Sequence, residues 1–84
     1  MEKEVGVITH YFTHLGVAVL KVTKGSVKAG DTIHIKGATT DLIQTINSLQ
    51  KDHEAIEEAK KGDEVGLKVE DHVRDHDKVF KVEA

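Results

Sequence analysis

The chain has 84 residues and a formal net charge of −3, with 12 basic and 15 acidic residues and no cysteine. A chain of this length can bury only one compact core, so we expect residues 1–84 to form a single domain. The absence of cysteine excludes disulfides, thiolate metal sites and thiol nucleophiles, and the negative charge argues against a protein that coats nucleic acid through bulk positive charge. The N-terminal residues do not resemble a leader, and no stretch approaches the roughly 18 apolar residues of a membrane span. We therefore expect a cytoplasmic protein with no membrane partner.

Three strands are predicted in the first half of the chain. Residues 4–12 and 15–23 are rich in β-branched side chains, which favour strands. Residues 31–36 alternate strictly, with Ile33 and Ile35 on one face and polar side chains on the other. Such alternation is typical of a half-buried strand.

A further strand is predicted around residue 44. Leu42, Gln44 and Ile46 hold a period of two, but the next apolar residue, Leu49, follows after an interval of three. The slip predicts a β-bulge near residues 47–48, where one extra residue would interrupt the pairing.

The remaining residues predict one loop and two strands. Residues 52–61 have helix-forming composition but few apolar side chains, so we expect a loop with at most one turn of helix. Residues 65–69 alternate, and residues 78–83 supply a final strand. About six short strands predict an all-β fold, closed into a small antiparallel β-barrel that leaves no exposed edge.

Several motifs occur in an order that resembles one family. The run VTKGSVKAGDTIHIKG at residues 22–37 joins two strand-like segments through two glycine-containing turns. It is followed by INSL at residues 46–49, HEAIEEA at 53–59 and GDEVGL at 62–67. Together these segments resemble the second domain of translational GTPases such as elongation factor Tu. The resemblance implies a translation-factor-type β-barrel and a role in protein biosynthesis.

The sequence lacks the motifs of a GTPase domain. It contains no G-x-x-x-x-G-K-S/T phosphate loop and no Asn-Lys-x-Asp motif, so nothing in it could cradle nucleotide phosphates or read guanine as a GTPase does. The carboxylates lie in a solvated acidic stretch without the burial that raises a pKa toward neutrality. We therefore predict no enzymatic activity, no catalytic residue and no cofactor.

The resemblance also implies candidate RNA-binding residues. In elongation factors the second domain helps to hold the acceptor end of aminoacyl-tRNA, and the matching positions here are near Gln50, His53 and Glu64. Two positions depart from the family pattern: a common acidic residue is Gln50 here, and a common glycine is Leu20. An amide and an imidazole can still hydrogen-bond to a ribose or a base.

Basic side chains are concentrated in residues 21–36, which carry four lysines and one acidic residue. Flexible cations on one face can contact RNA phosphates, although solvated strand surfaces are the ordinary alternative. Because Tyr11, Phe12 and Phe80 are the only aromatic residues, we do not expect a platform that stacks several bases. The candidate phosphate-binding residues are Lys21, Lys24, Lys28 and Lys36.

Two histidine pairs have a spacing that could bind a metal on a helix. His10 and His14 are four residues apart, as are His72 and His76, but these segments read as a strand end and a charged loop. Transition-metal sites need three or four converging ligands, so we predict surface histidines and no metal site. A small metal- or ligand-binding protein remains the third functional alternative.

Two leading hypotheses for function remain. The first is a non-catalytic, translation-factor-like barrel that binds tRNA, rRNA or a ribonucleoprotein through its loops. The second is a protein-interaction module with a larger protein partner, because the string KGATTD at residues 36–41 is also similar to the C-terminal barrel of collagenase-like peptidases.

Overall fold

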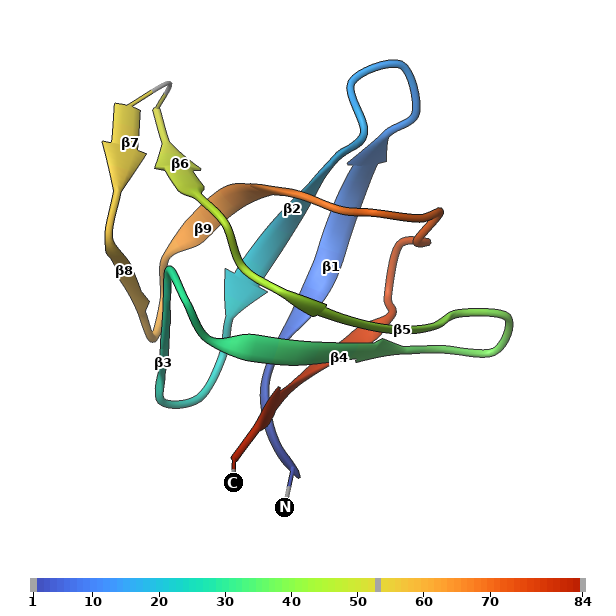
Figure 1. Ribbon diagram of the computed structural model, residues 1–84, viewed down its shortest axis with the longest axis horizontal. Coiled ribbons are helices and arrows are strands. Elements are labelled where there is room, and N and C mark those ends of the chain that lie inside the picture. Colours follow the sequence, from blue (N-terminus) through green and yellow to red (C-terminus); the bar gives the residue numbers. More distant parts are fainter. Residues whose placement is uncertain (1, 53, 84) are drawn as a thin grey trace.

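The structure, a computed structural model, describes residues 2–52 and 54–83. In these ranges the chain forms β-strands and no α-helix (Figure 1). No helix there is long and apolar enough to cross a membrane. The strands are β1 (Glu2–Phe12), β2 (Val17–Val22), β3 (Ser26–Lys28), β4 (Thr32–Lys36), β5 (Asp41–Thr45), β6 (Leu49–Lys51), β7 (Glu54–Ile56), β8 (Glu58–Lys60), β9 (Glu64–Lys68) and β10 (Lys78–Val82).

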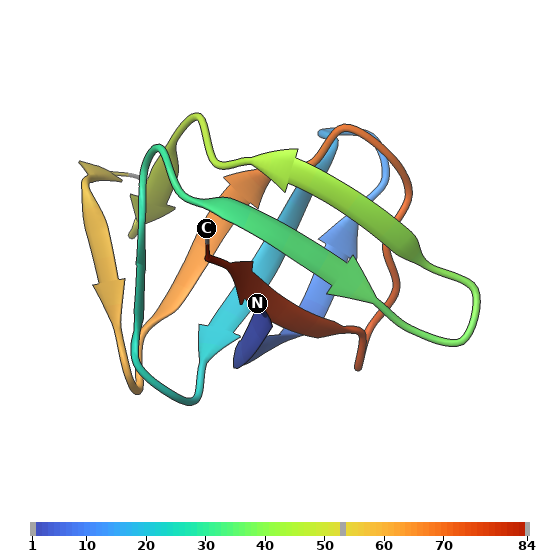
Figure 2. The same ribbon diagram turned by 60° about the horizontal axis from the view of Figure 1, so that its bottom comes forward.

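The strands form one large sheet and one small sheet. The large sheet has 8 strands in the order β5-β4-β10-β1-β2-β9-β6-β7, and β3 pairs with β8 in a 2-stranded sheet. The large sheet curls so that β4 and β5 cross over β1 and β2 (Figure 2). Among the described residues, β5 pairs only with β4 and β7 only with β6, so both edges are free. The prediction of a closed barrel of about six strands is therefore wrong, although the fold is all-β.

Most of the predicted strands correspond to observed strands, but residues 52–61 do not form the predicted loop. They contain β7 and β8 instead of a turn of helix. Ala59 of β8 is fully buried and lies opposite Val27 of β3 in the small sheet. Pairing with β3 and burial of Ala59 thus outweigh the weak helical preference of a short, polar segment.

The slip in the pattern before Leu49 has a different origin from the predicted bulge. The strand β5 ends at Thr45 and β6 begins at Leu49, so residues 46–48 are a connection between two strands. The irregular register lies in β1 instead, between Glu4 and Gly6 against β10 and between Ile8 and His10 against β2. These irregularities bend β1, the longest strand, along the curled sheet.

Two turns with the same geometry lead into β4 and β9. In the first, the Lys28 N–H donates to the Asp31 carboxylate at 2.9 Å and the Asp31 N–H donates to the Lys28 carbonyl at 3.0 Å. In the second, the Lys60 N–H donates to the Asp63 carboxylate at 2.9 Å and the Asp63 N–H donates to the Lys60 carbonyl at 2.9 Å. The third residue of each turn is glycine, with φ of 97° and 95°, as a type II turn requires.

A third turn of this kind leads into β10 without a glycine. The Arg74 N–H donates to the buried Asp77 carboxylate at 2.8 Å, and the Asp77 N–H donates to the Arg74 carbonyl at 3.2 Å. The third position is occupied by His76, with φ of 73°. A side chain in this left-handed region is strained relative to glycine.

The free edge β5 is joined to the end of β9 by a side chain. Gln44 is only 4% exposed. Its Nε2 donates to the Lys68 carbonyl at 2.9 Å, and its Oε1 accepts a hydrogen bond from the Glu70 N–H at 2.8 Å. The amide thus forms hydrogen bonds with backbone groups at the seam of the curled sheet, where β5 meets the end of β9, as a neighbouring strand would.

Replacement of Gln44 by leucine should destabilise the fold. Gln44→Leu removes both hydrogen bonds of the seam and leaves the backbone groups of Lys68 and Glu70 without that partner. We expect the free energy of unfolding to fall by about 1–3 kcal/mol, measured by urea denaturation. Gln50→Leu is the matched control, because Gln50 is exposed, and it should change stability by less than about 0.5 kcal/mol. Equal effects of the two variants would contradict the role of the seam.

Glycine at position 76 should stabilise the protein. A side chain in the left-handed region costs about 1–2 kcal/mol of stability, and His76→Gly removes this cost. The greater freedom of glycine in the unfolded chain lowers stability by about 0.5–1 kcal/mol. We expect a net gain of about 0.5 kcal/mol in thermal or urea unfolding. Gly62→His is the reverse experiment. A Cβ at Gly62 meets nothing within 4 Å, so its expected loss of stability reports backbone strain alone.

Candidate nucleic-acid interface

A shallow notch lies on the outer surface where β2, β9 and β6 are neighbours. In register, Gly66 of β9 lies opposite Val19 of β2 on one side and Gln50 of β6 on the other. Lys68 lies opposite Val17. The notch has a volume of about 120 Å³ and is lined by Val17, Ser48, Gln50, Gly66, Leu67 and Lys68.

The missing side chain of Gly66 opens this notch. A Cβ built on Gly66 would lie 3.5 Å from the Val17 Cγ1 and 3.9 Å from the Gln50 carbonyl oxygen, which are ordinary van der Waals distances. The backbone could therefore carry alanine without strain, but a methyl group would occupy part of the space. The fold tolerates a side chain at this position, and glycine leaves the floor of the notch open.

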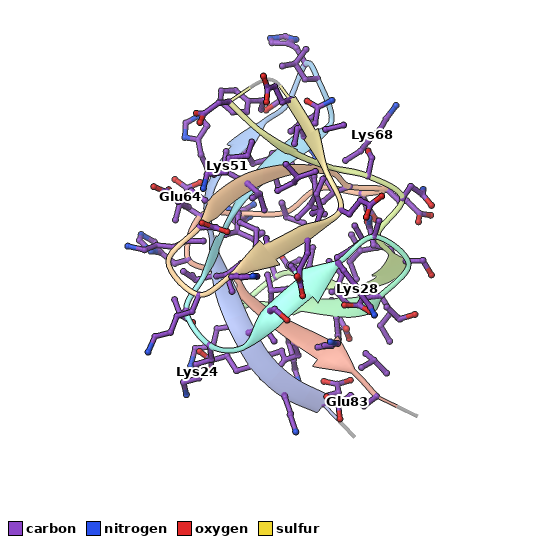
Figure 3. The ribbon with its side chains drawn as sticks, turned by 90° about the vertical axis from the view of Figure 1, so that its left-hand side faces the viewer. Lys24, Lys28, Lys51, Glu64, Lys68 and Glu83 are labelled. Carbon is purple, nitrogen blue, oxygen red and sulfur yellow. The ribbon has the colours of Figure 1, made fainter. Side chains whose placement is uncertain are left out.

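The rim of the notch carries three kinds of polar group. Gln50 can donate and accept hydrogen bonds, Ser48 offers a hydroxyl group, and Lys68 offers a cation. All three residues are exposed, and the Lys68 side chain extends outward in Figure 3. A polar rim over an aliphatic floor can accommodate a sugar or a base edge, with a phosphate beside the cation.

Glu64 lies on the same face of β9 as Gly66, two residues earlier. Its carboxylate accepts a hydrogen bond from the Thr9 hydroxyl at 3.5 Å, and it lies opposite Lys21 of β2 in register. The structure thus brings Gln50 and Glu64 onto strands that pair with each other. His53, the third residue implied by the resemblance, lies outside the described residues.

An ion pair ties β6 to the turn that precedes β9. The Lys51 ammonium donates to the Asp63 carboxylate at 2.9 Å. This hydrogen bond raises the pKa of Lys51. The pKa of Asp63 is lowered first by the hydrogen bond from the Lys60 backbone and then by Lys51. Lys51 therefore helps to fix the two strands that frame the notch.

The four candidate lysines are not gathered into one patch. Lys24 lies in the loop before β3 and Lys28 at the end of β3, both exposed (Figure 3). Lys36 ends β4 opposite Lys78, on the far side of the molecule from β3 (Figure 1). Lys21 lies on β2 beside an acidic side chain. Among the four, Lys24 and Lys28 come from neighbouring parts of the chain, the loop before β3 and the last residue of β3.

Sequence reasoning missed Lys68, Ser48 and the aliphatic wall of the notch. Lys68 follows a buried leucine in an alternating strand, so its outward position could be predicted from the sequence. Its neighbours in the notch could not be predicted, because Val17 and Ser48 come from other parts of the chain and lie near Lys68 only through strand pairing.

The most conspicuous titratable cluster is a buried histidine between two carboxylates. The Nδ1 of His34 in β4 lies 2.9 Å from the Glu2 carboxylate, and its Nε2 contacts the Asp41 carboxylate. The hydrogen bond to Asp41 and then that to Glu2 raise the pKa of His34. Since both ring nitrogens face acceptors, the imidazolium form satisfies both carboxylates. Because both ring nitrogens contact a carboxylate, His34 of β4 links Glu2 of β1 to Asp41 of β5.

The curled sheet and the notch define a small all-β module with a shallow polar notch on its outer surface. A family model for elongation factor Tu domain 2 matches residues 16–75. The chain therefore belongs to the elongation factor Tu domain 2 family, as the motifs at residues 22–37, 46–49 and 62–67 indicated.

Two proteins with similar sequences carry the names of proteases. The chain is 35% identical over 72 residues to a collagenase of Porphyromonas gingivalis, covering 84% of this chain and 20% of the collagenase. It is 36% identical over 78 residues to an uncharacterized protease of Methanocaldococcus jannaschii, covering 92% of this chain and 19% of the protease. The chain thus spans about a fifth of the length of these relatives.

Two solved structures share the fold. The crystal structure of the C-terminal domain of a putative U32 peptidase from Geobacillus thermoleovorans superposes with a TM-score of 0.87 at 17% identity, covering 94% of this chain and 91% of that domain. Its selenomethionine variant gives a TM-score of 0.86 at 18% identity, with coverage of 92% and 96%. Both resemblances found in the sequence, to elongation factors and to collagenase-like peptidases, are confirmed.

The stability of the protein should depend on the ionisation of His34. Because its pKa is raised in the folded state, the folded protein binds a proton more tightly than the unfolded chain. The stabilisation is fully present below the ordinary pKa of 6.5 and is lost as pH rises through the higher folded value. Urea unfolding from about pH 6 to about pH 9 should show this decline. His34→Gln should flatten it, whereas His14→Gln, at an exposed position, should leave it intact.

Proposed function

We propose that this domain is a non-catalytic module that binds the single-stranded end of an RNA at the notch between β6 and β9. The observation that carries the proposal is the open floor at Gly66, framed by the amide of Gln50 and the cation of Lys68. A notch of about 120 Å³ can receive the sugar or a base edge of one unpaired nucleotide, while its phosphate meets the lysine outside the notch.

The surrounding charges support weak, salt-sensitive binding. Lys24 and Lys28 are exposed on the side of the molecule shown in Figure 3, where they can meet phosphates of a longer strand. The net charge of −3 supplies no general attraction for RNA. Affinity therefore depends on a few phosphate contacts together with the shape of the notch.

Filling the notch should weaken binding of RNA. Gly66→Ala places a methyl group on the notch floor without strain, and Lys68→Ala removes the cation. Each should raise the Kd for a fluorescently labelled tRNA about tenfold, measured by anisotropy near 50 mM salt. Lys36→Ala is the control for lost charge, because Lys36 lies at the far end of β4. Wild-type affinity in both notch variants, or no binding by the wild-type protein, would refute the site.

Charge reversal beside β3 separates the phosphate contacts from the notch. The double variant with Lys24→Glu and Lys28→Glu should weaken tRNA binding and flatten its salt dependence, since each lost phosphate contact removes about 0.7 from the slope for a single strand. The same measurement on Gly66→Ala should show a weaker affinity at an unchanged slope. A slope unaltered in the double variant would exclude these lysines from the contact.

A protein-interaction module is the second candidate function. Phe12 is 43% exposed and Leu15 is 66% exposed, and both lie at the turn between β1 and β2. Two relatives named as proteases are about five times as long as the matched region. We propose that this turn docks onto a larger protein of the collagenase type, as a second use of the same fold.

Titration against a larger relative tests the second candidate. The Methanocaldococcus jannaschii protease, with its matching residues deleted, should bind this chain with a Kd of about micromolar order by calorimetry. Leu15→Lys should weaken that binding at least about tenfold. Ile43→Lys is the control, because Ile43 is also exposed but lies on β5. Absence of binding by the wild-type chain would end this alternative.

A further inference from the structure

A second pocket lies between the end of β1 and the segment that joins β9 to β10. It has a volume of about 490 Å³ and is lined by Tyr11, His72, Val73, Arg74 and Asp75. Tyr11 and Arg74 are the only tyrosine and the only arginine in the chain. Pockets that hold small ligands have volumes of about 300–1,000 Å³, so this one is large enough for a nucleotide.

The pocket is preformed, because the segment is pinned to the body of the domain. The Val69 N–H donates to the Gly16 carbonyl at 2.9 Å, and the His76 N–H donates to the Ile8 carbonyl at 2.7 Å. Val73 is only 1% exposed. A segment without regular strands is thus held at both ends and in its middle, which fixes the backbone that carries the lining residues.

An aromatic surface forms one part of the pocket. The rings of Tyr11 and His72 have centroids 4.9 Å apart and are inclined at 60°. Tyr11 is half-buried and packs on the core, whereas His72 is exposed. A flat ligand can therefore contact a ring that the core holds in position, with His72 beside it.

The polar groups of the pocket are of opposite charge. Arg74 and Asp75 are both exposed. Among the residues that the structure describes, the Arg74 guanidinium has no hydrogen bond or ion pair, and its backbone alone is engaged. A fork of donors and a carboxylate acceptor are thus available beside an aromatic surface. Asp71 and Glu70 lie nearby in the sequence, so a ligand recognised by its negative charge alone would be repelled.

These groups match the edges of guanine. Its O6 and N7 accept a bidentate pair of hydrogen bonds from arginine, and its N1–H and N2–H groups can donate to a carboxylate. Adenine presents an amino donor in place of O6, so it faces Arg74 with the wrong polarity. We propose that this pocket binds one unpaired base of a single-stranded RNA, with guanine preferred over adenine. The inference rests on the proposed RNA-binding function.

The pocket and the notch lie on opposite faces of the sheet. Tyr11 of the pocket pairs with the buried Ala18, whereas Val17 and Lys68 of the notch pair at outward positions. The pocket would therefore contact a base of the same RNA separately from the notch. Base selection by the pocket would add sequence preference to a notch whose contacts favour no particular base.

Titration with free mononucleotides tests the pocket without the notch. In ¹⁵N-HSQC spectra of the whole chain, GMP should shift the amide signals of residues 71–75 at millimolar concentrations, and AMP should do so at least about fivefold more weakly. Arg74→Ala should abolish the GMP shifts, and Asp75→Asn should weaken GMP binding without altering AMP binding. Lys68→Ala is the control and should leave the GMP shifts unchanged. The spectra themselves report whether each variant is folded.

The two proposals fail separately in these experiments. Equal shifts with GMP and AMP, no shifts with GMP, or GMP shifts that survive Arg74→Ala would overturn the guanine pocket. GMP shifts that depend on Arg74, together with tRNA binding insensitive to Gly66→Ala, would retain the pocket and refute the notch. Loss of tRNA affinity in Gly66→Ala without any GMP response would retain the notch alone.

Discussion

The amide of Gln44 holds the curled sheet together at the seam where no strand pair does. A sheet edge leaves backbone groups without partners, and here the side chain of Gln44 accepts from one backbone group and donates to another. The same two bonds fix the end of β9 at Lys68 and the start of the following segment at Glu70. Lys68 lines the notch, and the segment after Glu70 lines the second pocket. Both proposed sites therefore depend on one buried amide.

Several acidic residues stabilise the fold through hydrogen bonds and ion pairs. Asp31, Asp63 and Asp77 each close a turn before a strand, and the first two also form ion pairs with lysines of neighbouring strands. Glu2 and Asp41 clasp His34. These five of the 15 acidic residues therefore stabilise turns and contacts between strands. The notch and the pocket retain groups, such as the Arg74 guanidinium and the Gln50 amide, that face solvent.

Membership of the elongation factor Tu domain 2 family establishes the fold, but it leaves the use of the fold open. Two relatives named as proteases are about five times as long as the matched region, so a domain of this kind also occurs within proteins that are not named as translation factors. Function has to be argued from the sites. The open floor at Gly66 is the basis of the proposed nucleotide site, and the exposed turn with Leu15 is the basis of the proposed protein contact. The two surfaces meet at Val17, which lines the notch and pairs with Phe12 of the turn.

The sequence by itself determined the all-β class and the inward residues of the regular strands, because alternation with a period of two follows from the pleat. It placed Gln44 in step with Leu42 and Ile46, and the resemblance pointed to Gln50 and Glu64. The tertiary structure alone decided that the sheet stays open, that residues 52–61 form two strands, and that Gln44 meets Lys68. Each of these depends on pairing between residues far apart in the chain. The free energy of such pairing comes from burial and hydrogen bonds with partners that a local pattern does not contain.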